Sequence, residues 1–334
     1  MKRNPYVKID EYDIETRNQP RKIINISITE EDIRKYPDMY TAYDRFSKLT
    51  GLSKDSFILT NGTENALRIA MQVLKRVKNI KTVITEIPTW GLADVIAYQC
   101  NFEKSYKLDY IYREGKFHLF YPGLEFIDEP YNNMILYKTN KMNNLFVHED
   151  EDEYKSKNNT IYTIHDYTYT PFDAVDKELD EHNIIIGSFS KVFGCGIRLG
   201  FVIFNKEYFD MMNIYREEYI SPIACESLKY LLDRYGNIKN CNNIYKEEAF
   251  RKYESEKLFE ETFKDHIICS TPYYYTMDIY VGNVGLVSKR FEVEGKDFYR
   301  LGRFLKEDPN GYFVFKNAFT NINQYYNLNG NNSL

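Results

Sequence analysis

Short apolar runs alternate with segments of helical periodicity between residues 57 and 204, and this alternation limits the fold more than any other feature. The run SFILT is followed by an Asn-Gly turn and by the amphipathic pattern TENALRIAMQVLKRV. The run KTVITEIPTW ends in a proline turn before a helical pattern at LADVIAYQC. Strands that are apolar on both faces are typical of a parallel sheet covered by helices, so the sequence predicts an α/β domain. Further buried strands are expected at residues 132–140, 159–169, 183–191 and 199–204.

The flanking segments have a different pattern. Residues 38–51, DMYTAYDRFSKLTG, are predicted to form a helix that ends at a glycine. Residues 205–263 look mainly helical, and the later runs YYYTMDIYVG and GYFVFKNAF resemble strands of a small α+β domain. No internal repeat or long linker separates the two parts, so we expect them to pack against each other.

Composition narrows the class of protein. With 43% apolar and 28% charged residues, the 334-residue chain has the balance of an ordinary globular protein. Its 44 basic and 49 acidic residues form no basic stripe, so we expect a small-molecule partner and neither nucleic acid nor an anionic membrane.

The five cysteines are scattered and never form a CxxC pair, which argues against a disulfide scaffold or a zinc site and favours a reducing compartment. The opening residues lack the apolar segment of a signal peptide, and no run approaches the ~18 apolar residues of a membrane span. We therefore expect a cytoplasmic protein without a bound metal.

Polar residues follow the predicted strands, and ligands of parallel sheets collect at the carboxyl ends of strands. Gly62, Thr63 and Glu64 open a helix, where free N–H groups favour an anion, although a TNGT sequence alone is also a common helix cap. Asp166 and Tyr169 stand three residues apart in HDYTY, past the apolar part of the run at 159–169. A buried carboxylate there needs a cationic partner, which could be His165 or a nitrogen atom of a ligand.

The stretch SFSKVFGCGIRLGF, residues 188–201, places Lys191 before a glycine-rich turn and Arg198 after it. An amine that is removed from water holds its proton less tightly, which suits it to form a Schiff base. Ser188, Ser190 and Arg198 could hold a phosphate, the arginine through its planar fork of donors. The other interpretation is a glycine-rich surface turn.

The sequence GSFSKVFGCGIRLGF resembles the lysine motif of fold-type I pyridoxal-phosphate enzymes. It is similar in particular to the class I/II aminotransferases, which include histidinol-phosphate aminotransferase with its decarboxylase and lyase relatives. The resemblance covers most of the chain in order, through KYPDMYTAYDRF, TNGTENAL, EIPTWG, HDYTY, the lysine motif and YISPIACESL.

The resemblance implies a large domain with a mainly parallel central sheet flanked by helices, plus a smaller α+β domain. We expect the large, cofactor-binding domain at residues 41–220 and the small domain at residues 221–334. Residues 1–40 would belong to the small domain and to a dimer contact.

The resemblance also implies roles around the ring of pyridoxal 5'-phosphate. Lys191 would form the Schiff base and later move the α-proton of the substrate. Asp166 would pair with the pyridinium nitrogen, Tyr169 would hydrogen-bond the phenolate oxygen, and Trp90 would stack on the ring.

The same resemblance implies a phosphate site and a homodimer. Tyr36 matches a tyrosine that reaches the phosphate of the partner subunit, although Tyr36 and Trp90 could also be ordinary core aromatics. The phosphate contacts would come from Gly62, Thr63, Ser188 and Arg198, with help from Ser190.

Two departures from the family pattern bear on the substrate. The family's Asn-Pro-Thr-Gly turn is replaced by YKTNKMNN, where Asn140 is our choice for the ring-oxygen contact and Lys141 is the ungapped alternative. The arginine that grips the substrate carboxylate is replaced by Lys316 in GYFVFKNAF, and a lysine lacks the planar fork.

The expected function is therefore an aminotransferase that acts on an amino acid or an amine. A decarboxylase or lyase on the same scaffold is the alternative, followed by a protein that binds the cofactor without turnover.

Overall fold

The computed structural model describes the chain over eight ranges, which are residues 36–128, 130–140, 161–175, 179–193, 197–216, 219–249, 254–280 and 288–302. Within these ranges, no helix combines the length and the apolar character needed to cross a lipid bilayer.

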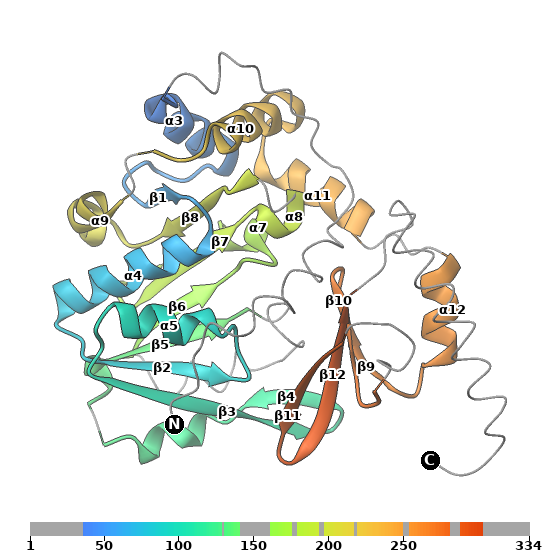
Figure 1. The fold of residues 1–334 in the computed structure, drawn as a ribbon. Coiled ribbons are helices and arrows are strands. Elements are labelled where there is room, and N and C mark those ends of the chain that lie inside the picture. Colours follow the sequence, from blue (N-terminus) through green and yellow to red (C-terminus); the bar gives the residue numbers. More distant parts are fainter. Residues whose placement is uncertain are drawn as a thin grey trace, which may run out of the picture.

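A large eight-stranded sheet forms the centre of the molecule, in the order β1-β8-β7-β6-β5-β2-β3-β4 (Figure 1). Strands β3, β2, β5, β6 and β7 run parallel to their neighbours in this series, whereas β8 is antiparallel to β7 and β1, and β4 is antiparallel to β3. The strands are β1 (Phe57–Thr60), β2 (Thr82–Ile87), β3 (Lys104–Arg113), β4 (Lys116–Leu119), β5 (Met134–Thr139), β6 (Tyr162–Asp166), β7 (Asn183–Ser188) and β8 (Gly200–Ile203).

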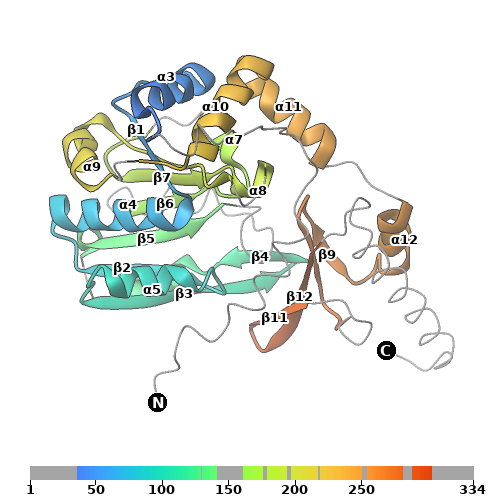
Figure 2. The ribbon, with the colours of Figure 1, turned by 45° about the horizontal axis from the view of Figure 1, so that its top comes forward.

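Helices cover both faces of this sheet, as Figures 1 and 2 show. The described helices are α3 (Met39–Thr50), α4 (Thr63–Lys78), α5 (Leu92–Gln99), α7 (Pro171–Ala174), α8 (Ser190–Phe193), α9 (Phe209–Tyr215), α10 (Pro222–Tyr235), α11 (Ile238–Ala249) and α12 (Glu254–Thr262). Short 3₁₀ turns occupy Tyr121–Phe126, Tyr131–Asn133 and Lys206–Tyr208.

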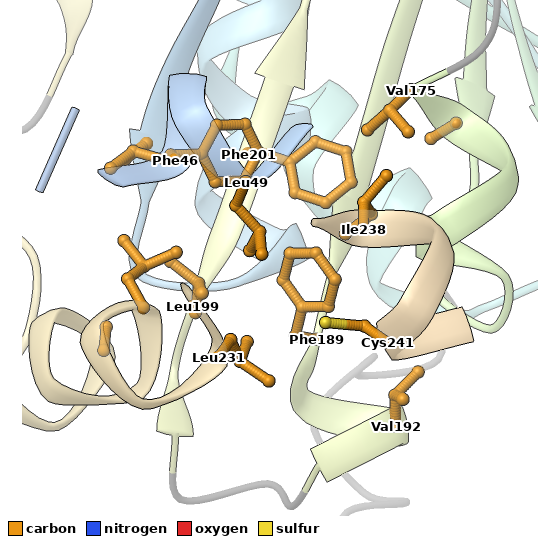
Figure 3. Packing of buried hydrophobic residues seen from close by; sticks show 14 of the residues in the cluster. Phe46, Leu49, Val175, Phe189, Val192, Leu199, Phe201, Leu231, Ile238 and Cys241 are labelled. Carbon is orange, nitrogen blue, oxygen red and sulfur yellow. The ribbon is translucent and has the colours of Figure 1, made fainter. Parts of the chain in front are cut away.

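One face is packed by α4, α5 and α9, whose apolar residues share a cluster with alternate residues of β5, β6 and β7. The opposite face is packed by α3, α7, α8, α10 and α11 (Figure 3). Phe46 of α3, Phe189 and Phe201 meet in this second cluster, with the ring centres of Phe46 and Phe201 5.7 Å apart. Burial on both faces explains why the central strands are apolar throughout.

A second sheet of four antiparallel strands lies beside the β3–β4 end of the first (Figures 1 and 2). Phe291, Val293 and Phe298 of this small sheet pack against Phe117 and Leu119 of β4. Its strands, in the order β11-β12-β10-β9, are β9 (Ile267–Ser270), β10 (Tyr274–Met277), β11 (Ser288–Val293) and β12 (Lys296–Gly302).

The predicted α/β architecture is confirmed, including a helix from residue 39 that ends before Gly51 in the left-handed conformation. Asp38 caps this helix by accepting the N–H of Thr41 at 3.2 Å. Strands β3 and β4 were not predicted, although the alternation of polar and apolar residues in β3 is the pattern of a half-buried strand near a sheet edge. The run GYFVFKNAF falls outside the described residues, and the domain boundaries stay predictions.

Candidate active site

The carboxylate of Asp166 ends β6 and is buried. Its Oδ2 accepts the hydroxyl of Tyr137 at 2.6 Å. Its Oδ1 accepts the backbone N–H of Thr168 at 2.8 Å and the hydroxyl of Thr168 at 2.5 Å. Donors on both oxygens stabilise the ionised form of a carboxyl group.

His165 was one of the two partners considered for Asp166. Successive residues of a strand point to opposite faces, and the Nε2 atom of His165 lies 2.8 Å from the side-chain oxygen of Asn183. Asp166 instead accepts hydrogen bonds from Tyr137 and Thr168, which no sequence pattern indicated.

Thr168 connects Asp166 to the start of α4. The hydroxyl oxygens of Thr168 and Thr63 are 2.7 Å apart, and Thr63 is the first residue of that helix. The first N–H groups of a helix have no partner within the helix and carry its partial positive charge, so this end of α4 suits an anion.

The guanidinium of Arg198 lies directly over Gly62, the residue before α4. A Cβ atom on Gly62 would be 2.6 Å from Nη2 of Arg198, and Gly62 has a φ of +100° that other residues rarely adopt. The same Nη2 donates to the backbone oxygen of Asn61 at 2.8 Å. The φ of Gly62 favours glycine, and the absence of a Cβ leaves room for the cation at the helix start.

Ser188 and Ser190 are both buried at the junction of β7 and α8. The hydroxyl of Ser188 lies 2.9 Å from the hydroxyl oxygen of Ser190 and 3.0 Å from the carbonyl oxygen of Leu199, and it accepts the N–H of Ser190 at 3.1 Å. These bonds fix the start of α8, which carries Lys191. The glycines at 194 and 196 lie outside the described residues.

Lys191 lies over the ring of Tyr169, with its Nζ 5.8 Å from the ring centre. Tyr169 is buried and packs edge-on against Tyr273, whose hydroxyl donates to the carbonyl oxygen of Tyr169 at 3.2 Å. The predicted lysine and tyrosine therefore do come together.

Arg300 of β12 reaches the same tyrosine and was not identified from the sequence. Its Nη2 lies 3.4 Å from the hydroxyl of Tyr169, its guanidinium carbon is 4.3 Å from the ring centre of Tyr274, and the side chain is buried. A buried arginine is uncommon, and its position here brings a cation from the small sheet to the loop after β6.

The remaining predicted residues lie around this centre. The N–H of Asn140 donates to the carbonyl oxygen of Asp166 at 2.9 Å, and its side-chain oxygen accepts the hydroxyl of Thr170 at 3.0 Å. Trp90 follows β2 and packs, partly buried, on the apolar cluster of α4 and α5. Lys141 and Lys316 lie outside the described residues.

Tyr36 is 82% exposed, and its ring stacks on that of Tyr219 at 4.7 Å. The backbone oxygen of Tyr219 accepts the side-chain amide of Asn61 at 3.1 Å. Tyr36 therefore lies on the outside of the corner that Arg198 and Gly62 form.

Solved structures share this fold. The chain is similar to a candidate histidinol-phosphate aminotransferase from Erwinia carotovora atroseptica SCRI1043, with a TM-score of 0.68, 14% identity, and coverage of 89% of this chain and 90% of that one. An aspartate aminotransferase from Thermotoga maritima gives a TM-score of 0.64 and 16% identity, covering 92% and 90% of the two chains. L-threonine-O-3-phosphate decarboxylase from Porphyromonas gingivalis gives a TM-score of 0.59 and 15% identity, covering 86% of this chain and 93% of that one. At these identities the likeness shows the fold. No curated protein sequence matches the chain.

The architecture is thus that of the fold-type I transferases. Residues 29–233, more than half of the chain, match the family model of aminotransferase class I and II. The chain belongs to this family and is an aminotransferase, as the lysine motif predicted. Enzymes of the family depend on pyridoxal phosphate.

Replacing Gly62 with alanine tests the anion site. The Gly62→Ala variant should bind pyridoxal phosphate at least about tenfold more weakly, because the new methyl group displaces Arg198 and the backbone is strained by ~1–3 kcal/mol. Fluorescence titration of the protein with the cofactor measures this change. Gly91→Ala is the matched control, because a Cβ there meets open space. Equal affinities for both variants would exclude Gly62 from the site.

Proposed function

We propose that this aminotransferase binds pyridoxal 5'-phosphate at the carboxyl ends of β6 and β7 and moves an amino group between an amino acid or amine and a keto acid. One arrangement supports the proposal. The carboxylate of Asp166 is linked through Thr168 and Thr63 to the helix start where Arg198 lies, and Lys191 stands over the tyrosine three residues beyond Asp166.

These residues fit the functional groups of the cofactor. The phosphate is an anion, which suits Arg198 and the N–H groups at the start of α4. Asp166 would hold a proton on the pyridine nitrogen, and the primary amine of Lys191 would bind the aldehyde carbon with loss of water. When bound, the cofactor supplies an electron-withdrawing ring that stabilises negative charge on the substrate α-carbon.

The chain's own residues have distinct tasks in this proposal. Tyr137 and Thr168 donate to the two oxygens of Asp166 and fix its position, so that it would keep a proton on the ring nitrogen. The Nζ atom of Lys191, once displaced by the substrate amine, can take a proton from the α-carbon and return it elsewhere. Tyr169 contacts both cations, since Lys191 lies over its ring and Arg300 reaches its hydroxyl.

Arg300 is our candidate for binding the substrate carboxylate, the task for which the run around Lys316 lacks an arginine. The guanidinium reaches the hydroxyl of Tyr169 from β12, and its planar fork can hold a carboxylate through two hydrogen bonds. This contact would make an α-amino acid a better substrate than a simple amine.

A homodimer is part of the proposal. The exposed stack of Tyr36 on Tyr219 adjoins Asn61 and the phosphate corner, which Arg198 and Gly62 form. A second copy packed on this stack would contact the phosphate site of the first copy, and the first copy would contact that of the second. Light scattering of the purified protein should return twice the 39.8 kDa of one chain, because the second copy would cover the exposed ring of Tyr36 beside the phosphate corner. The mass of a single chain at micromolar concentration would contradict this part.

The cofactor linkage is tested by replacing Lys191 with alanine. The wild-type protein should develop a visible absorbance band with pyridoxal phosphate, and Lys191→Ala should lack it. Lys229→Ala, which changes an exposed lysine on α10, is the control and should keep the band. A wild-type protein without the band would overturn the proposal.

In the same experiment, added amino acids should convert the cofactor to pyridoxamine phosphate and release a keto acid. Release of carbon dioxide instead would identify the decarboxylase alternative. An unchanged band across a broad panel of amino acids and amines would mean binding without turnover.

The role of Arg300 is tested by Arg300→Met and Arg300→Lys. Arg300→Met should lower kcat/KM for amino acids by more than about 100-fold, because two charge-assisted hydrogen bonds are each worth ~1.5–3 kcal/mol. Arg300→Lys should lower it less, because a lysine restores part of that interaction. The ratio of activities with an amine and with the matching amino acid should rise. Arg290→Met removes an exposed arginine of the same hairpin, paired with Asp297, and should leave the rate within about twofold of wild type. An unchanged ratio for the Arg300 variants would refute the assignment.

A further inference from the structure

A fully buried carboxyl group on β2 is not used in the proposed reaction. Both oxygens of Glu86 lie 3.1 Å from the backbone nitrogen of Thr139, whose N–H they accept, and Oε2 also accepts the hydroxyl of Thr139 at 2.6 Å. Burying a carboxyl group on a central strand lowers the stability of the fold unless hydrogen bonds compensate for the lost contacts with water.

The hydrogen bonds of Glu86 continue the pairing of β2 with β5 beyond the point where their backbone pairing ends. Strands β2 and β5 pair in register as far as Thr85 and Tyr137, whereas β5 and β6 stay paired as far as Thr139 and Asp166. Beyond Tyr137, the side chain of Glu86 provides the acceptor for the N–H of Thr139. The end of β5 is therefore held on one side by a side chain and on the other by the β6 backbone.

The residue after Thr139 belongs to the candidate site. The N–H of Asn140 donates to the carbonyl oxygen of Asp166 at 2.9 Å, and the Asn140 side chain accepts the hydroxyl of Thr170 at 3.0 Å. A shift of Thr139 would move Asn140 and disturb the backbone at Asp166, because the three residues are joined by consecutive covalent and hydrogen bonds.

We propose that Glu86 is a positioning residue: its carboxylate clamps Thr139 and thereby fixes Asn140 and Asp166 for the cofactor ring. The Glu86–Thr139 clamp is present in the protein without ligand. Only its effect on cofactor binding rests on the proposed function.

Glu86 also makes the clamp sensitive to pH. Burial raises the pKa of Glu86 from 4.5 to about 7, and Thr139, Lys138 on β5 and Tyr110 on β3 oppose the rise. Above that pH the ionised carboxylate accepts all the bonds from Thr139. Below it, a proton occupies one oxygen and competes with those donors.

Four variants of the full chain test the clamp without requiring turnover. Glu86→Gln and Thr139→Val should each speed amide hydrogen exchange of residues 134–140 relative to the other strands of the large sheet in the protein without cofactor, because the clamp limits local opening. Each should also weaken pyridoxal-phosphate binding about tenfold. The double variant should be no weaker than the worse single one, because the partners act as a unit. Thr139→Ser keeps both donors and should behave like the wild type.

The outcomes separate the clamp from the proposed function. Exchange and cofactor affinity within about twofold of wild type in both Glu86→Gln and Thr139→Val would overturn the clamp, even though the cofactor still binds. A wild-type protein that does not bind the cofactor would overturn the proposed function, and the exchange measurement would still decide the clamp. If Glu86→Gln fails to fold, the comparison of Thr139→Val with Thr139→Ser gives the answer.

The pH dependence adds a signature that simple destabilisation would not give. Cofactor affinity of the wild type should fall from about pH 8 to about pH 6, and Glu86→Gln should show no such step. Global stability should change the opposite way: since the pKa is higher in the fold than in the unfolded chain, ionisation of Glu86 destabilises the fold as the pH rises through 7. Glu86→Gln should therefore unfold at higher denaturant than wild type at about pH 8, with the gain shrinking toward pH 5. A gain that is independent of pH would count against the titration of Glu86.

Discussion

The buried carboxylate of Asp166 is the constraint on which the site depends. A carboxylate at the end of a central strand is removed from water, and it stays charged only where donors surround it. Tyr137 from the neighbouring strand and Thr168 from the following loop supply those donors. Each donor is itself held by the fold, since Tyr137 is packed in the cluster beneath α4 and Thr168 bonds to the first residue of α4.

The rest of the sheet keeps this edge in place through close packing. Gly187 on β7 has no side chain because the ring of Phe201 occupies the space: a Cβ there would be 2.4 Å from the ring. Gly62 likewise has no side chain, which leaves room for the guanidinium of Arg198 at the helix start. The two glycines thus have different tasks, since Gly187 makes room for a core ring and Gly62 makes room for the guanidinium at the site.

The sequence predicted the parts of the fold that local patterns encode. The apolar runs of β5, β6 and β7, the Asn-Gly turn before α4 and the lysine motif all have a signal within a few residues. The contacts of Arg300 and Glu86 do not, because Arg300 meets a tyrosine 131 positions earlier and Glu86 meets a threonine 53 positions later. Such contacts depend on strand order and on the face that each side chain takes, which a single sequence does not contain. The same reason explains why His165 was considered as a partner for Asp166 although its ring bonds to Asn183.

The central claim is that one amine, that of Lys191, holds the cofactor at this edge of the sheet. The most direct measurement is borohydride reduction of the protein with pyridoxal phosphate, followed by peptide mapping by mass spectrometry, because reduction makes the link between aldehyde and amine permanent. The account predicts a single modified lysine at position 191. A stable label on another lysine, with position 191 unmodified, would contradict it.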